Sequence, residues 1–536
     1  MTTQKTANFF SQIFSEIPDL EKEEKSRQES NSIKRAIRQL FIPDSKTTDE
    51  LFDANLQIAA GPHFQCSSVK NEDVHIYLGE EKLTIKFPQS FEECNFDVSI
   101  MENIKKRNYK TPTQIQAAMI PLIHDTEYDI LGHSQTGTGK TAAFLLPLIN
   151  EIHKGHQSGI ITFNSDSPYA IVLATTRELV MQLHEDALAF ASGTSVSVAY
   201  AIGDMPSGYS IRELKKGCDI FITTIGKLCD HLAYSVVTTY KMKYFVLDEA
   251  DRFLSKQCAL DDLRRLNEFG YLKQKHRTIM LSATFDAESL NDVKNEFMAE
   301  NHCWVRAGAV NQVINTITQK ILKVAHFQKR QTLLQMLLDK STNLNQSFEE
   351  PIYKTEKTVI FIRGRRECDR LAIVLACEGF RVIPVNTHRT LRQRTEAVEK
   401  FKKGEYDILV SNDLLARGMN FPNVDHVINY DLPTPENLVQ YIHAVGRTGR
   451  AGNAGLATSF FDPFGADTLL AKSLILILED SMQEVPEFLQ NIVRQQDIIA
   501  KNCELYQSDP LYEEIGLECV PTTSEECLPL NNDDTW

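Results

Sequence analysis

Short apolar segments alternate with amphipathic segments along most of the chain. A first series of apolar runs between residues 128 and 284 reads YDILGH, AIVLAT, DIFITT, YFVLDEA and TIMLSAT. A second series between residues 358 and 461 reads TVIFIR, RVIPV, YDILVSN, HVINY and LATSFF. Continuous apolar strands separated by helices are typical of a parallel sheet covered by helices on both faces. The pattern therefore predicts two α/β domains of similar size.

The segments that flank and join these series are more polar. Residues 1–86 form a charge-mixed extension, which we expect to be partly disordered and to end in one or two strands within VHIYLGEEKLTIKF. A polar stretch at 307–315 precedes ITQKILKV and predicts a short linker. The first domain is then expected at 87–306, the second at 316–490, and an acidic, disordered tail at 491–536.

Charge and composition narrow the class of protein. The 536 residues include 57 Lys and Arg against 72 Asp and Glu, a net charge of −15, and residues 501–536 hold nine of the acids and one lysine. This balance argues against a generally basic surface but not against a local basic groove. The eleven cysteines form no CxxC pair, which favours free thiols in a reducing compartment over a zinc site. No apolar run approaches the ~18 residues that span a membrane, and the start has no basic-then-apolar secretory pattern.

A glycine-rich sequence lies between a predicted strand and a predicted helix. It reads Ser134-Gln135-Thr136-Gly137-Thr138-Gly139-Lys140-Thr141 and follows YDILGH. This is the context of a phosphate-binding loop, because glycines let backbone N–H groups curl around phosphates. Lys140 would neutralise the β- and γ-phosphates and Thr141 would hold Mg²⁺. Ser134 stands where the strict motif has glycine, so an ordinary glycine-rich turn is the alternative.

Acidic residues end another predicted strand. Asp248-Glu249-Ala250-Asp251 follows the apolar run YFVL. A carboxylate at the carboxyl end of a strand beside a phosphate loop is where such proteins hold their metal. Asp248 would bind Mg²⁺ through water, and Glu249 would polarise the attacking water. The alternative is a solvated acidic turn.

Two arginines lie three residues apart in the second domain. Arg447 and Arg450 occur in HAVGRTGR, residues 443–450. Arginine binds phosphate with two parallel hydrogen bonds and stabilises the charge of phosphoryl transfer. A basic surface turn would be the simpler interpretation. If both arginines reach the nucleotide, catalysis requires the two domains to close.

Seven motifs in a fixed order resemble those of DEAD-box RNA helicases over about residues 87–490. The remaining ones, beside the three above, are Phe91…Tyr109…Pro112-Thr113-Gln114-Ile115-Gln116, Thr176-Arg177-Glu178-Leu179, Ser282-Ala283-Thr284 and Ala416-Arg417-Gly418, with His443 opening the last. The resemblance implies two tandem RecA-like domains, ATP and Mg²⁺ as cofactors, and RNA as partner. QEVPEFL (483–489) and the acidic end NNDDTW are similar to the Vasa-type subgroup.

The resemblance also implies roles for individual residues. Gln116 would read the adenine edge, Tyr109 would stack on the ring and Phe91 would pack behind them, while Asn420 would contact the ribose. Arg417 resembles the arginine near the attacking water. The coupling set that links the nucleotide to His443 would be Asp251, Ser282, Ala283 and Thr284. The implied contacts to the RNA backbone, which we call the RNA face, are Thr176, Arg177, Gly203, Thr223, Thr224, Gly226, Arg363, Gly364, Arg394 and Asn412.

Departures from the family pattern lie mostly on the RNA face, at the ribose and at the closure interface. They are Asp204 for the second glycine of a Gly-Gly turn, Ile225 and Lys227 in the TPGR turn, Asn386-Thr387-His388 for HGD, Leu391 for the glutamine of QxxR, Asn412 for threonine, Asn420 for the aspartate of ARGxD, and Ala444 for arginine. A negative charge at residue 204 should weaken phosphate approach. Asparagine at 420 can hydrogen-bond but carries no charge. The catalytic set Lys140, Glu249, Arg417, His443, Arg447 and Arg450 is complete. We therefore expect a working ATPase with weakened or altered RNA coupling.

The expected function is ATP-dependent remodelling of RNA or RNA–protein complexes by closure of the two domains and ATP hydrolysis. RNA would be recognised by shape and 2′-OH rather than by sequence. The first alternative is an ATP-dependent RNA clamp or scaffold with weak or uncoupled unwinding; a DNA translocase and an inactive interaction protein are the others. We expect a monomer with protein partners on its terminal extensions and no membrane association. The expected location is cytoplasmic, including ribonucleoprotein granules, with a nuclear location left open. The tail could recruit partners or compete for the RNA groove.

Overall fold

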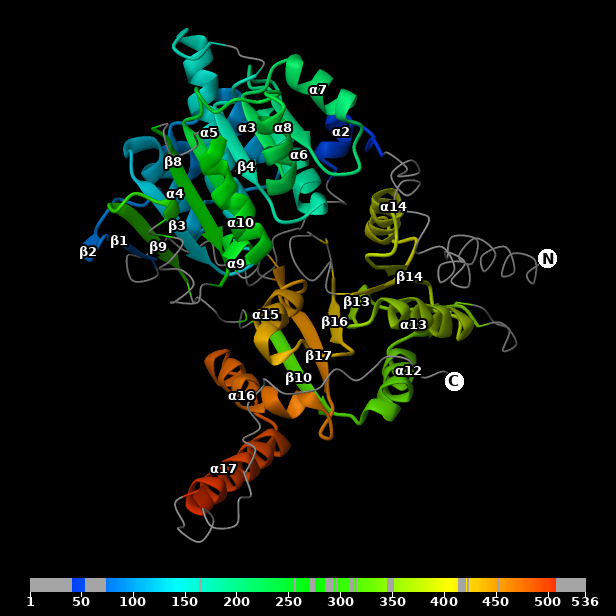
Figure 1. The fold of residues 1–536 in the computed structure, drawn as a ribbon. Coiled ribbons are helices and arrows are strands. Elements are labelled where there is room, and N and C mark those ends of the chain that lie inside the picture. The colour runs from blue at the N-terminus through cyan, green and yellow to red at the C-terminus, as the bar shows by residue number, and fades with distance from the viewer. Residues whose placement is uncertain are drawn as a thin grey trace, which may run out of the picture.

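The computed structural model describes residues 41–53, 74–162, 166–254, 257–269, 275–284, 294, 296–308, 313, 316–344, 351–412, 421, 424–450 and 453–507. Within them the chain forms a nine-stranded sheet, a six-stranded sheet and a two-stranded ribbon. Figure 1 shows the larger sheet with its helices in the upper body and the smaller one in the lower body. All ten strands expected from the two apolar series form, so the predicted fold class is confirmed.

The first sheet contains the strands expected from the first apolar series. Its strands are β1 (Val74–Leu78), β2 (Glu81–Leu83), β3 (Asp129–Ser134), β4 (Ala170–Leu173), β5 (Val198–Ala201), β6 (Ile220–Thr223), β7 (Tyr244–Asp248), β8 (Arg277–Ser282) and β9 (His302–Ala307). Their spatial order is β2-β1-β9-β3-β8-β7-β4-β6-β5. The seven strands from β9 to β5 are parallel, and β1 and β2 add an antiparallel edge. Strands β3 and β7 lie near the middle, fully buried, as continuous apolar runs predict.

The second sheet is parallel throughout. Its strands are β10 (Ile317–Lys323), β13 (Thr358–Phe361), β14 (Val382–Val385), β15 (Ile408–Ser411), β16 (His426–Asn429) and β17 (Gly455–Phe461), in the order β10-β17-β16-β13-β15-β14. The ribbon pairs β11 (Thr342–Asn343) with β12 (Tyr353–Lys354). Outside the ribbon, strand β9 inside the first sheet was not predicted, and neither were two strands at sheet edges, β5 and β10. Both alternate between buried and more exposed positions, because an edge strand packs less completely, and so neither forms a continuous apolar run.

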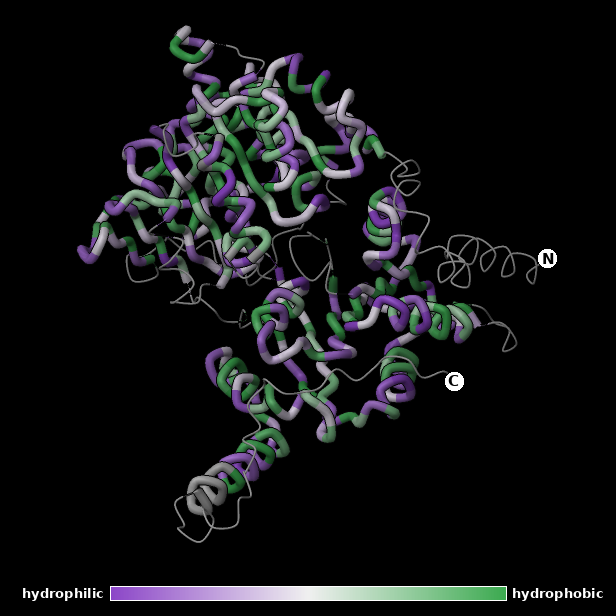
Figure 2. Tube along the Cα trace, viewed as in Figure 1, coloured by the Kyte–Doolittle hydropathy of each residue, from purple (hydrophilic) through white to green (hydrophobic). Residues whose placement is uncertain are grey.

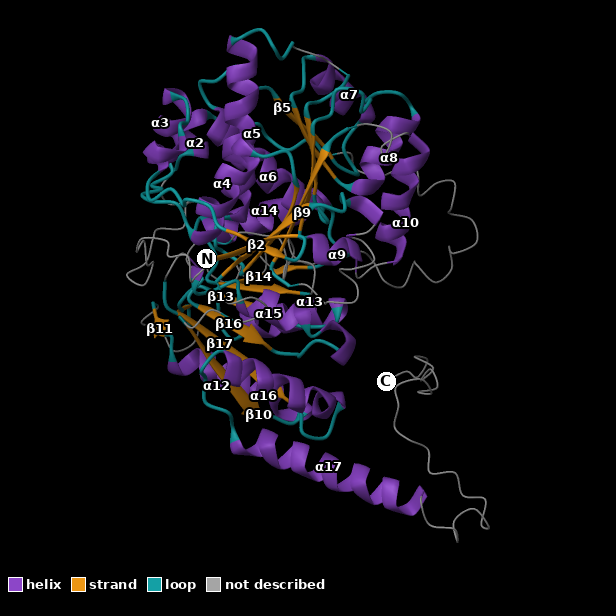
Figure 3. Ribbon diagram, turned by 90° about the vertical axis from the view of Figure 1, so that its left-hand side faces the viewer, coloured by secondary structure: helices purple, strands orange, loops and turns teal. Residues whose placement is uncertain are grey.

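Helices cover both faces of the first sheet (Figure 3). They are α2 (Thr48–Leu51), the 3-10 turn η2 (Phe91–Cys94), α3 (Val98–Lys106), α4 (Gln114–Asp125), α5 (Lys140–Gln157), α6 (Arg177–Ala191), α7 (Ser207–Lys215), α8 (Ile225–Ala233), α9 (Ala250–Leu254), α10 (Gln257–Arg265) and η3 (Leu266–Phe269). One core cluster packs α4, α5 and α6 against the first sheet, and a second cluster packs α8 and α10 against other residues of the same sheet. Figure 2 shows these apolar positions gathered along the strands.

The second domain follows the same plan. Its helices are η5 (His326–Gln328), α12 (Lys329–Asp339), α13 (Arg365–Cys377), α14 (Leu391–Lys402), η6 (Pro435–Asn437), α15 (Val439–Val445), η8 (Ala466–Leu470), α16 (Ala471–Asp480) and α17 (Glu487–Gln507). Helix α17 extends below the second sheet in Figures 1 and 3. The tail predicted to be disordered from residue 491 is therefore helical up to Gln507, and its remainder lies outside the described residues.

The extension predicted to end at residue 86 contributes to the first domain. Strand β1 pairs with β9, so residues that precede the predicted boundary belong to the first sheet. Residues 41–53 lie on α6: Lys46 Nζ is 2.7 Å from Glu185 Oε2, and α2 contacts the same helix. Residues 307–315, the predicted linker, are described only at three positions. Among the helices of the described ranges, none is both long and apolar enough to cross a membrane.

Candidate active site

The glycine-rich sequence forms a tight loop between β3 and α5. Gly137 and Gly139 have φ angles of +77° and +85°, a conformation that favours glycine. The Lys140 ammonium donates to the carbonyl oxygens of Ser134 at 2.7 Å and Gln135 at 2.8 Å, so the loop curls around it. The predicted strand–loop–helix context of a phosphate-binding loop is therefore present.

Helix α4 supports this loop from behind. Thr113 Oγ1 donates to the carbonyl of Thr138 at 2.7 Å, and Gln116 Nε2 donates to that of Gly139 at 3.1 Å. A Cβ at Gly139 would lie 2.4 Å from Gln116 Nε2, so both the φ angle and the space require glycine there. The other end of the Gln116 amide accepts from the Thr113 N–H at 3.0 Å. Gln116 thus positions the loop, and its role in reading adenine stays a prediction.

The two aromatic residues expected near adenine lie together. Phe91 and Tyr109 stack with ring centroids 6.4 Å apart and planes 27° apart. Phe91 is buried, and Tyr109 also contacts Phe190 of α6, with ring centroids 6.0 Å apart. Burial raises the pKa of the Tyr109 hydroxyl to about 12. This arrangement agrees with Phe91 packing behind Tyr109, whereas contact with a base stays a prediction.

The two carboxylates at the end of β7 occupy different environments. Asp248 is buried at 5% exposure and accepts from the Glu249 N–H at 3.0 Å. Glu249 has a φ of +55°, and its Oε2 accepts from Thr175 Oγ1 at 3.2 Å and lies 3.8 Å from Arg252 Nη1. Left-handed backbone in a non-glycine residue is uncommon and costs free energy, so the surrounding contacts must hold Glu249 in place.

The half-buried Lys140 and the buried Asp248 lie close enough to affect each other's pKa. Burial lowers the pKa of Lys140, and the nearby carboxylates of Asp248, Asp251 and Glu249 oppose that shift. Burial and the adjacent Glu249 raise the pKa of Asp248, while Lys140 lowers it. Burial therefore disfavours the charged form of each group, and each group favours the charged form of the other.

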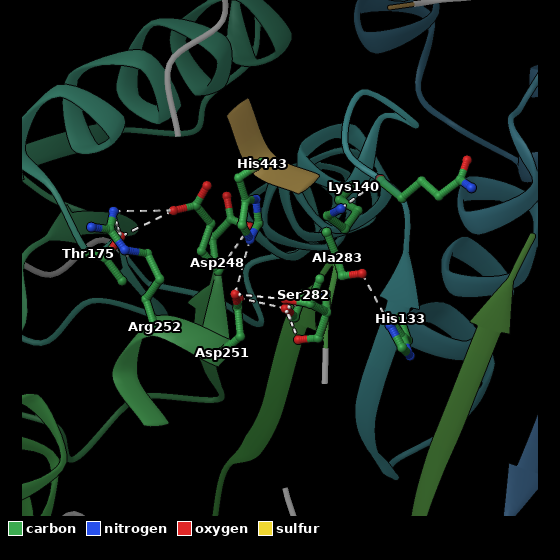
Figure 4. Close-up of polar contacts among 12 residues, drawn as sticks. His133, Lys140, Thr175, Asp248, Asp251, Arg252, Ser282, Ala283 and His443 are labelled. Atoms are coloured by element: carbon green, nitrogen blue, oxygen red, sulfur yellow. Dashed lines mark hydrogen bonds and ion pairs between the residues drawn. The ribbon is translucent and has the colours of Figure 1, made fainter. Parts of the chain in front are cut away.

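Asp251 contacts two other segments of the chain. Its Oδ1 accepts from Ser282 Oγ at 2.5 Å, and its Oδ2 accepts from Thr284 Oγ1 at 3.0 Å and lies 3.2 Å from His443 Nε2 of the second domain. Figure 4 shows His443 pointing at this carboxylate from the other side of the interface. Ala283, the middle residue, offers its carbonyl to His133 at 3.2 Å. The predicted coupling set is thus assembled, although its role in coupling stays a prediction.

Helix α15 brings the arginine pair to the phosphate loop. Arg447 Nε donates to the His443 carbonyl at 2.9 Å, and Arg450 Nε donates to that of Gly446 at 3.0 Å. A Cβ at Gly137 would lie 3.3 Å from Arg450 Cγ, and one at Gly446 would lie 2.3 Å from Thr136 Oγ1. Burial and the neighbouring Arg447 lower the pKa of Arg450. The two domains are therefore in direct contact at the loop.

These residues form one buried interface, which we call the catalytic seam. It consists of Lys140, Thr141, Asp248, Glu249, Asp251, Ser282, Thr284, His443, Arg447 and Arg450. Thr141 and Asp248 are the expected Mg²⁺ ligands. In the described part of the chain no group of three or more His, Cys, Asp or Glu side chains could hold a metal by itself. Two predicted residues, Arg417 and Asn420, lie outside the described residues.

The first-domain residues of the RNA face line the carboxyl ends of β4, β5 and β6. Thr176 caps α6 by accepting from the Leu179 N–H at 3.2 Å, and Thr224 occupies the N-cap of α8. Thr223 is buried and donates to the Ala201 carbonyl at 2.7 Å. A Cβ at Gly226 would meet open space. Arg177 forms an ion pair with Asp204, next to Gly203.

The second-domain residues of the RNA face are mostly engaged within the protein. Arg394 Nη2 lies 2.8 Å from Glu178 Oε1, a buried ion pair between the domains. Arg363 Nη2 donates to the Leu432 carbonyl at 2.6 Å, and Gly364 is the N-cap of α13. Asn412 is buried, and no donor among the described residues reaches its Oδ1. Contact of these groups with RNA stays a prediction.

Several departures from the family pattern turn out to be packing residues. Leu391 is buried and joins the core cluster of the first domain although it begins α14 of the second. Ala444 is buried in a core cluster of the second domain. Ile225 packs in the cluster under α8, and Lys227 lies 4.0 Å from Asp230. The Asn386 Oδ1 accepts from the His388 N–H at 3.0 Å and so shapes its own turn.

Two residues that the sequence analysis did not single out, and Thr113, which it named only within a motif, contact the site. Thr175 and Arg252 hold Glu249, and Arg252 Nη1 also donates to Thr175 Oγ1 at 3.3 Å. Thr113 holds the phosphate loop. Thr175 is the last residue of the predicted run AIVLAT, and Arg252 directly follows the acidic motif, so their neighbourhood was visible in the sequence. The sequence did not show that the side chains of Thr175 and Arg252 point toward Glu249.

Comparisons with known proteins agree on one family. Residues 113–293 match the DEAD/DEAH box helicase model, and residues 328–452 match the helicase conserved C-terminal domain. The ATP-dependent RNA helicase vasa of Drosophila melanogaster is 32% identical over 453 residues, 84% of this chain and 64% of that protein. The probable ATP-dependent RNA helicase DDX4 of Homo sapiens is 35% identical over 405 residues, 75% of this chain and 53% of that protein.

A solved structure supports the same conclusion. S. cerevisiae Dbp5 bound to RNA and ADP BeF3 aligns with a TM-score of 0.61 and 25% identity, over 76% of this chain and 99% of that one. The chain spans between about half and two-thirds of the length of the two curated relatives. The two matching domains, the relatives and the shared two-sheet fold together place this chain in the DEAD-box RNA helicase family, where it resembles the Vasa-type members.

Proposed function

We propose that this protein hydrolyses ATP in response to RNA and uses the cycle to remodel RNA or RNA–protein complexes. The observation that carries the proposal is the catalytic seam, in which side chains from both domains meet at one phosphate loop. His443 lies 3.2 Å from Asp251, and the Arg450 side chain lies against Gly137. Residues that act only when the domains close make hydrolysis depend on whatever favours closure.

The residues of the seam fit a nucleoside triphosphate. The loop offers backbone N–H groups at the start of the 18-residue helix α5, where the helix dipole favours an anion. Lys140 would bind the β- and γ-phosphates. Arg447 and Arg450 would approach from the second domain and stabilise charge on the transferred phosphoryl group. Phe91, Tyr109 and Gln116 would bind the adenine.

Mg²⁺ fits the same arrangement. It binds proteins through one or two carboxylates together with substrate phosphates and water, rather than through a full protein cage. Asp248 and the Thr141 hydroxyl are the groups that would hold it, and the ion would neutralise phosphate charge. Glu249, fixed by Thr175 and Arg252, would orient and polarise the attacking water and accept its proton. Arg417 would lie near that water.

RNA is the proposed activator. The printed names of the relatives describe ATP-dependent RNA helicases, and the related Dbp5 structure is bound to RNA. In this chain the N-termini of α6, α8 and α13 lie at the ends of parallel strands with Thr176, Thr224 and Gly364 as N-caps. Such termini and hydroxyls bind a phosphate backbone without reading its sequence. The Arg394–Glu178 pair would transmit RNA binding to domain closure.

We further propose that the protein acts as a monomer in the cytoplasm, including ribonucleoprotein granules, with protein partners on its terminal extensions. Figure 1 places α17 away from the seam, so a partner bound there would not block the nucleotide. Light scattering of the purified chain would test the monomer. A fluorescent fusion would test the location.

The decisive experiment measures ATP turnover with and without single-stranded RNA, together with unwinding of a short RNA duplex. Glu249→Gln is the inactive reference, because it keeps the shape of the side chain and removes the base. RNA-stimulated turnover and unwinding, both lost in the variant, would support the proposal. Retention of RNA on a non-hydrolysable ATP analogue without unwinding would instead identify an RNA clamp. Equal stimulation by DNA of the same sequence would identify a DNA translocase.

A further inference from the structure

The turn at Gly203 and Asp204 distinguishes this chain within the RNA face. Asp204 follows β5 and has a φ of +67°, where glycine or asparagine is the usual choice. Aspartate also tolerates this conformation, but here it places a negative charge among groups expected to meet phosphates.

Asp204 binds the arginine that the same face offers to RNA. The Arg177 Nη1 donates to Asp204 Oδ2, and the two side chains are 35% and 23% exposed. The guanidinium lies along the neighbouring glycine, since a Cβ at Gly203 would fall 2.7 Å from Arg177 Nη2. Gly203 thus provides the space in which Arg177 reaches Asp204. The carboxylate occupies hydrogen-bonding positions on Arg177 that a phosphate would use.

The amino-terminal segment holds the same turn from its backbone side. The Phe41 N–H donates to the Asp204 carbonyl at 2.9 Å, and Phe41 packs against the core of the first domain. The segment continues across α6, where Lys46 pairs with Glu185. The backbone of Asp204 is therefore held by the amino-terminal segment, while its carboxylate is held by Arg177.

We propose that Asp204 is an internal competitor for the RNA phosphate at Arg177, and that it sets a lower RNA affinity than the remainder of the RNA face would allow. This inference rests on the proposed RNA-binding function and adds a residue that determines its strength. A phosphate must displace the carboxylate before Arg177 can bind it. In addition, the negative charge of Asp204 repels nearby phosphates of the RNA backbone. Both effects weaken binding and lower its dependence on salt.

The test compares the full-length protein with Asp204→Gly and Asp204→Asn in binding to a fluorescent single-stranded RNA over a salt series. Both replacements accept the left-handed backbone, so the fold should survive, and thermal unfolding checks this. We expect roughly three- to tenfold tighter RNA binding for Asp204→Gly at low salt, and a slope of log affinity against log salt that steepens by about 0.7, the value for one additional phosphate contact.

Two controls separate the ion pair from general charge. Glu213→Gln removes one negative charge from α7, just beyond the turn, where Glu213 pairs with Lys216 at 2.8 Å and not with Arg177. It should shift RNA affinity much less than Asp204→Asn. Adding Arg177→Ala to Asp204→Gly should remove most of the gain, because the gain requires the released guanidinium. A purely structural role for Asp204 would not produce this dependence on Arg177.

The outcomes are distinct. Tighter binding that depends on Arg177 supports the inference. RNA binding by the unmodified protein that is unchanged or weakened in a folded Asp204→Gly variant overturns the inference and leaves the proposed function intact. An equal gain in Glu213→Gln overturns it in favour of general charge. If neither the unmodified protein nor Asp204→Gly binds RNA, the proposed function fails and the inference fails with it.

Discussion

The catalytic seam and the RNA face belong to the same closed arrangement, yet their charges are balanced in different ways. In the seam, the charges of Lys140 and Arg450 interact with carboxylates from other segments, and Asp248, His443 and Arg447 are almost fully buried. Arg450 lies against the glycine-rich loop. On the RNA face, Arg177 and Arg394 are already paired with Asp204 and Glu178. The seam is arranged for a ligand, whereas part of the RNA face is satisfied within the protein.

This difference leads us to expect that the seam sets the rate of hydrolysis and that the RNA face sets how strongly RNA regulates it. Buried, oriented charges contribute most to catalysis because little water screens them. A half-exposed ion pair such as Arg177–Asp204 contributes little to stability and can exchange partners. We therefore expect substitutions in the seam to lower ATP turnover itself, and substitutions on the RNA face to change how strongly RNA controls that turnover.

The largest expected effect is at Glu249. Glu249→Gln should lower ATP turnover by roughly 10²-fold or more, since it removes the group that polarises the attacking water. Steady-state phosphate release measures this directly. Glu479→Gln, on the exposed surface of α16, is the matched control and should retain full turnover. Substantial turnover in Glu249→Gln would show that the seam does not work as described.

The next effect tests the link between the domains. Asp251→Asn weakens the contacts to Ser282, Thr284 and His443 together, so the second domain should dock less tightly on the nucleotide. We expect roughly tenfold slower RNA-stimulated turnover, because the arginines reach the phosphates only after closure. Stopped-flow fluorescence between labels on the two domains should show slower or incomplete closure. Asp480→Asn on α16 is the control. Normal closure in Asp251→Asn would remove Asp251 from the coupling set.

A smaller effect is expected where the RNA face meets the domain interface. Leu391 belongs to the second domain but packs in the core cluster of the first, and Leu391→Gln should expose a polar group to that core. Closure of the domains should then depend more on RNA, so ATP turnover without RNA should be several-fold lower. Leu476→Gln, at a position 54% exposed on α16, controls for the substitution itself. If ATP turnover without RNA is the same in Leu391→Gln as in the unmodified protein, then Leu391 does not help to close the domains when RNA is absent.

The smallest effect concerns the amino-terminal segment. Lys46→Ala breaks the ion pair with Glu185, which lies on the exposed side of α6 and is worth about 0.2–1 kcal/mol. Proteolysis of the native protein should cleave the segment faster, while ATP turnover without RNA stays the same. Lys354→Ala, an exposed lysine in β12 of the second domain, provides the control. Equal cleavage rates would show that Phe41 packing alone holds the segment.

The strands were predictable from the sequence where both of their faces are buried. The ten strands predicted from continuous apolar runs each form where expected, nine of them inside a sheet and β14 at an edge. The edge strands β5 and β10 were missed because one of their faces is more exposed, which breaks the run. Helix α17 was taken for tail because its sequence is mostly polar and packs on α16 over only part of its length.

The candidate site was predictable where a motif fixes the backbone. The phosphate loop, the strand-end carboxylates and the arginine pair all adopt the expected local structures. What the sequence left open was the direction of side chains between distant segments. It placed Asp204 as a repulsive charge, but it did not reveal that Asp204 binds Arg177. Likewise, Thr175 and Arg252 could be linked to Glu249 only in three dimensions.

The most direct test of this account is the stimulation of ATP turnover by single-stranded RNA, measured side by side for the unmodified protein and Asp204→Gly. The ratio of turnover with saturating RNA to turnover without it reports coupling, and the RNA concentration at half-stimulation reports affinity. We predict that Asp204→Gly reaches half-stimulation at a several-fold lower RNA concentration, with the chemistry of the seam intact. Half-stimulation at the same RNA concentration in both proteins would contradict the account.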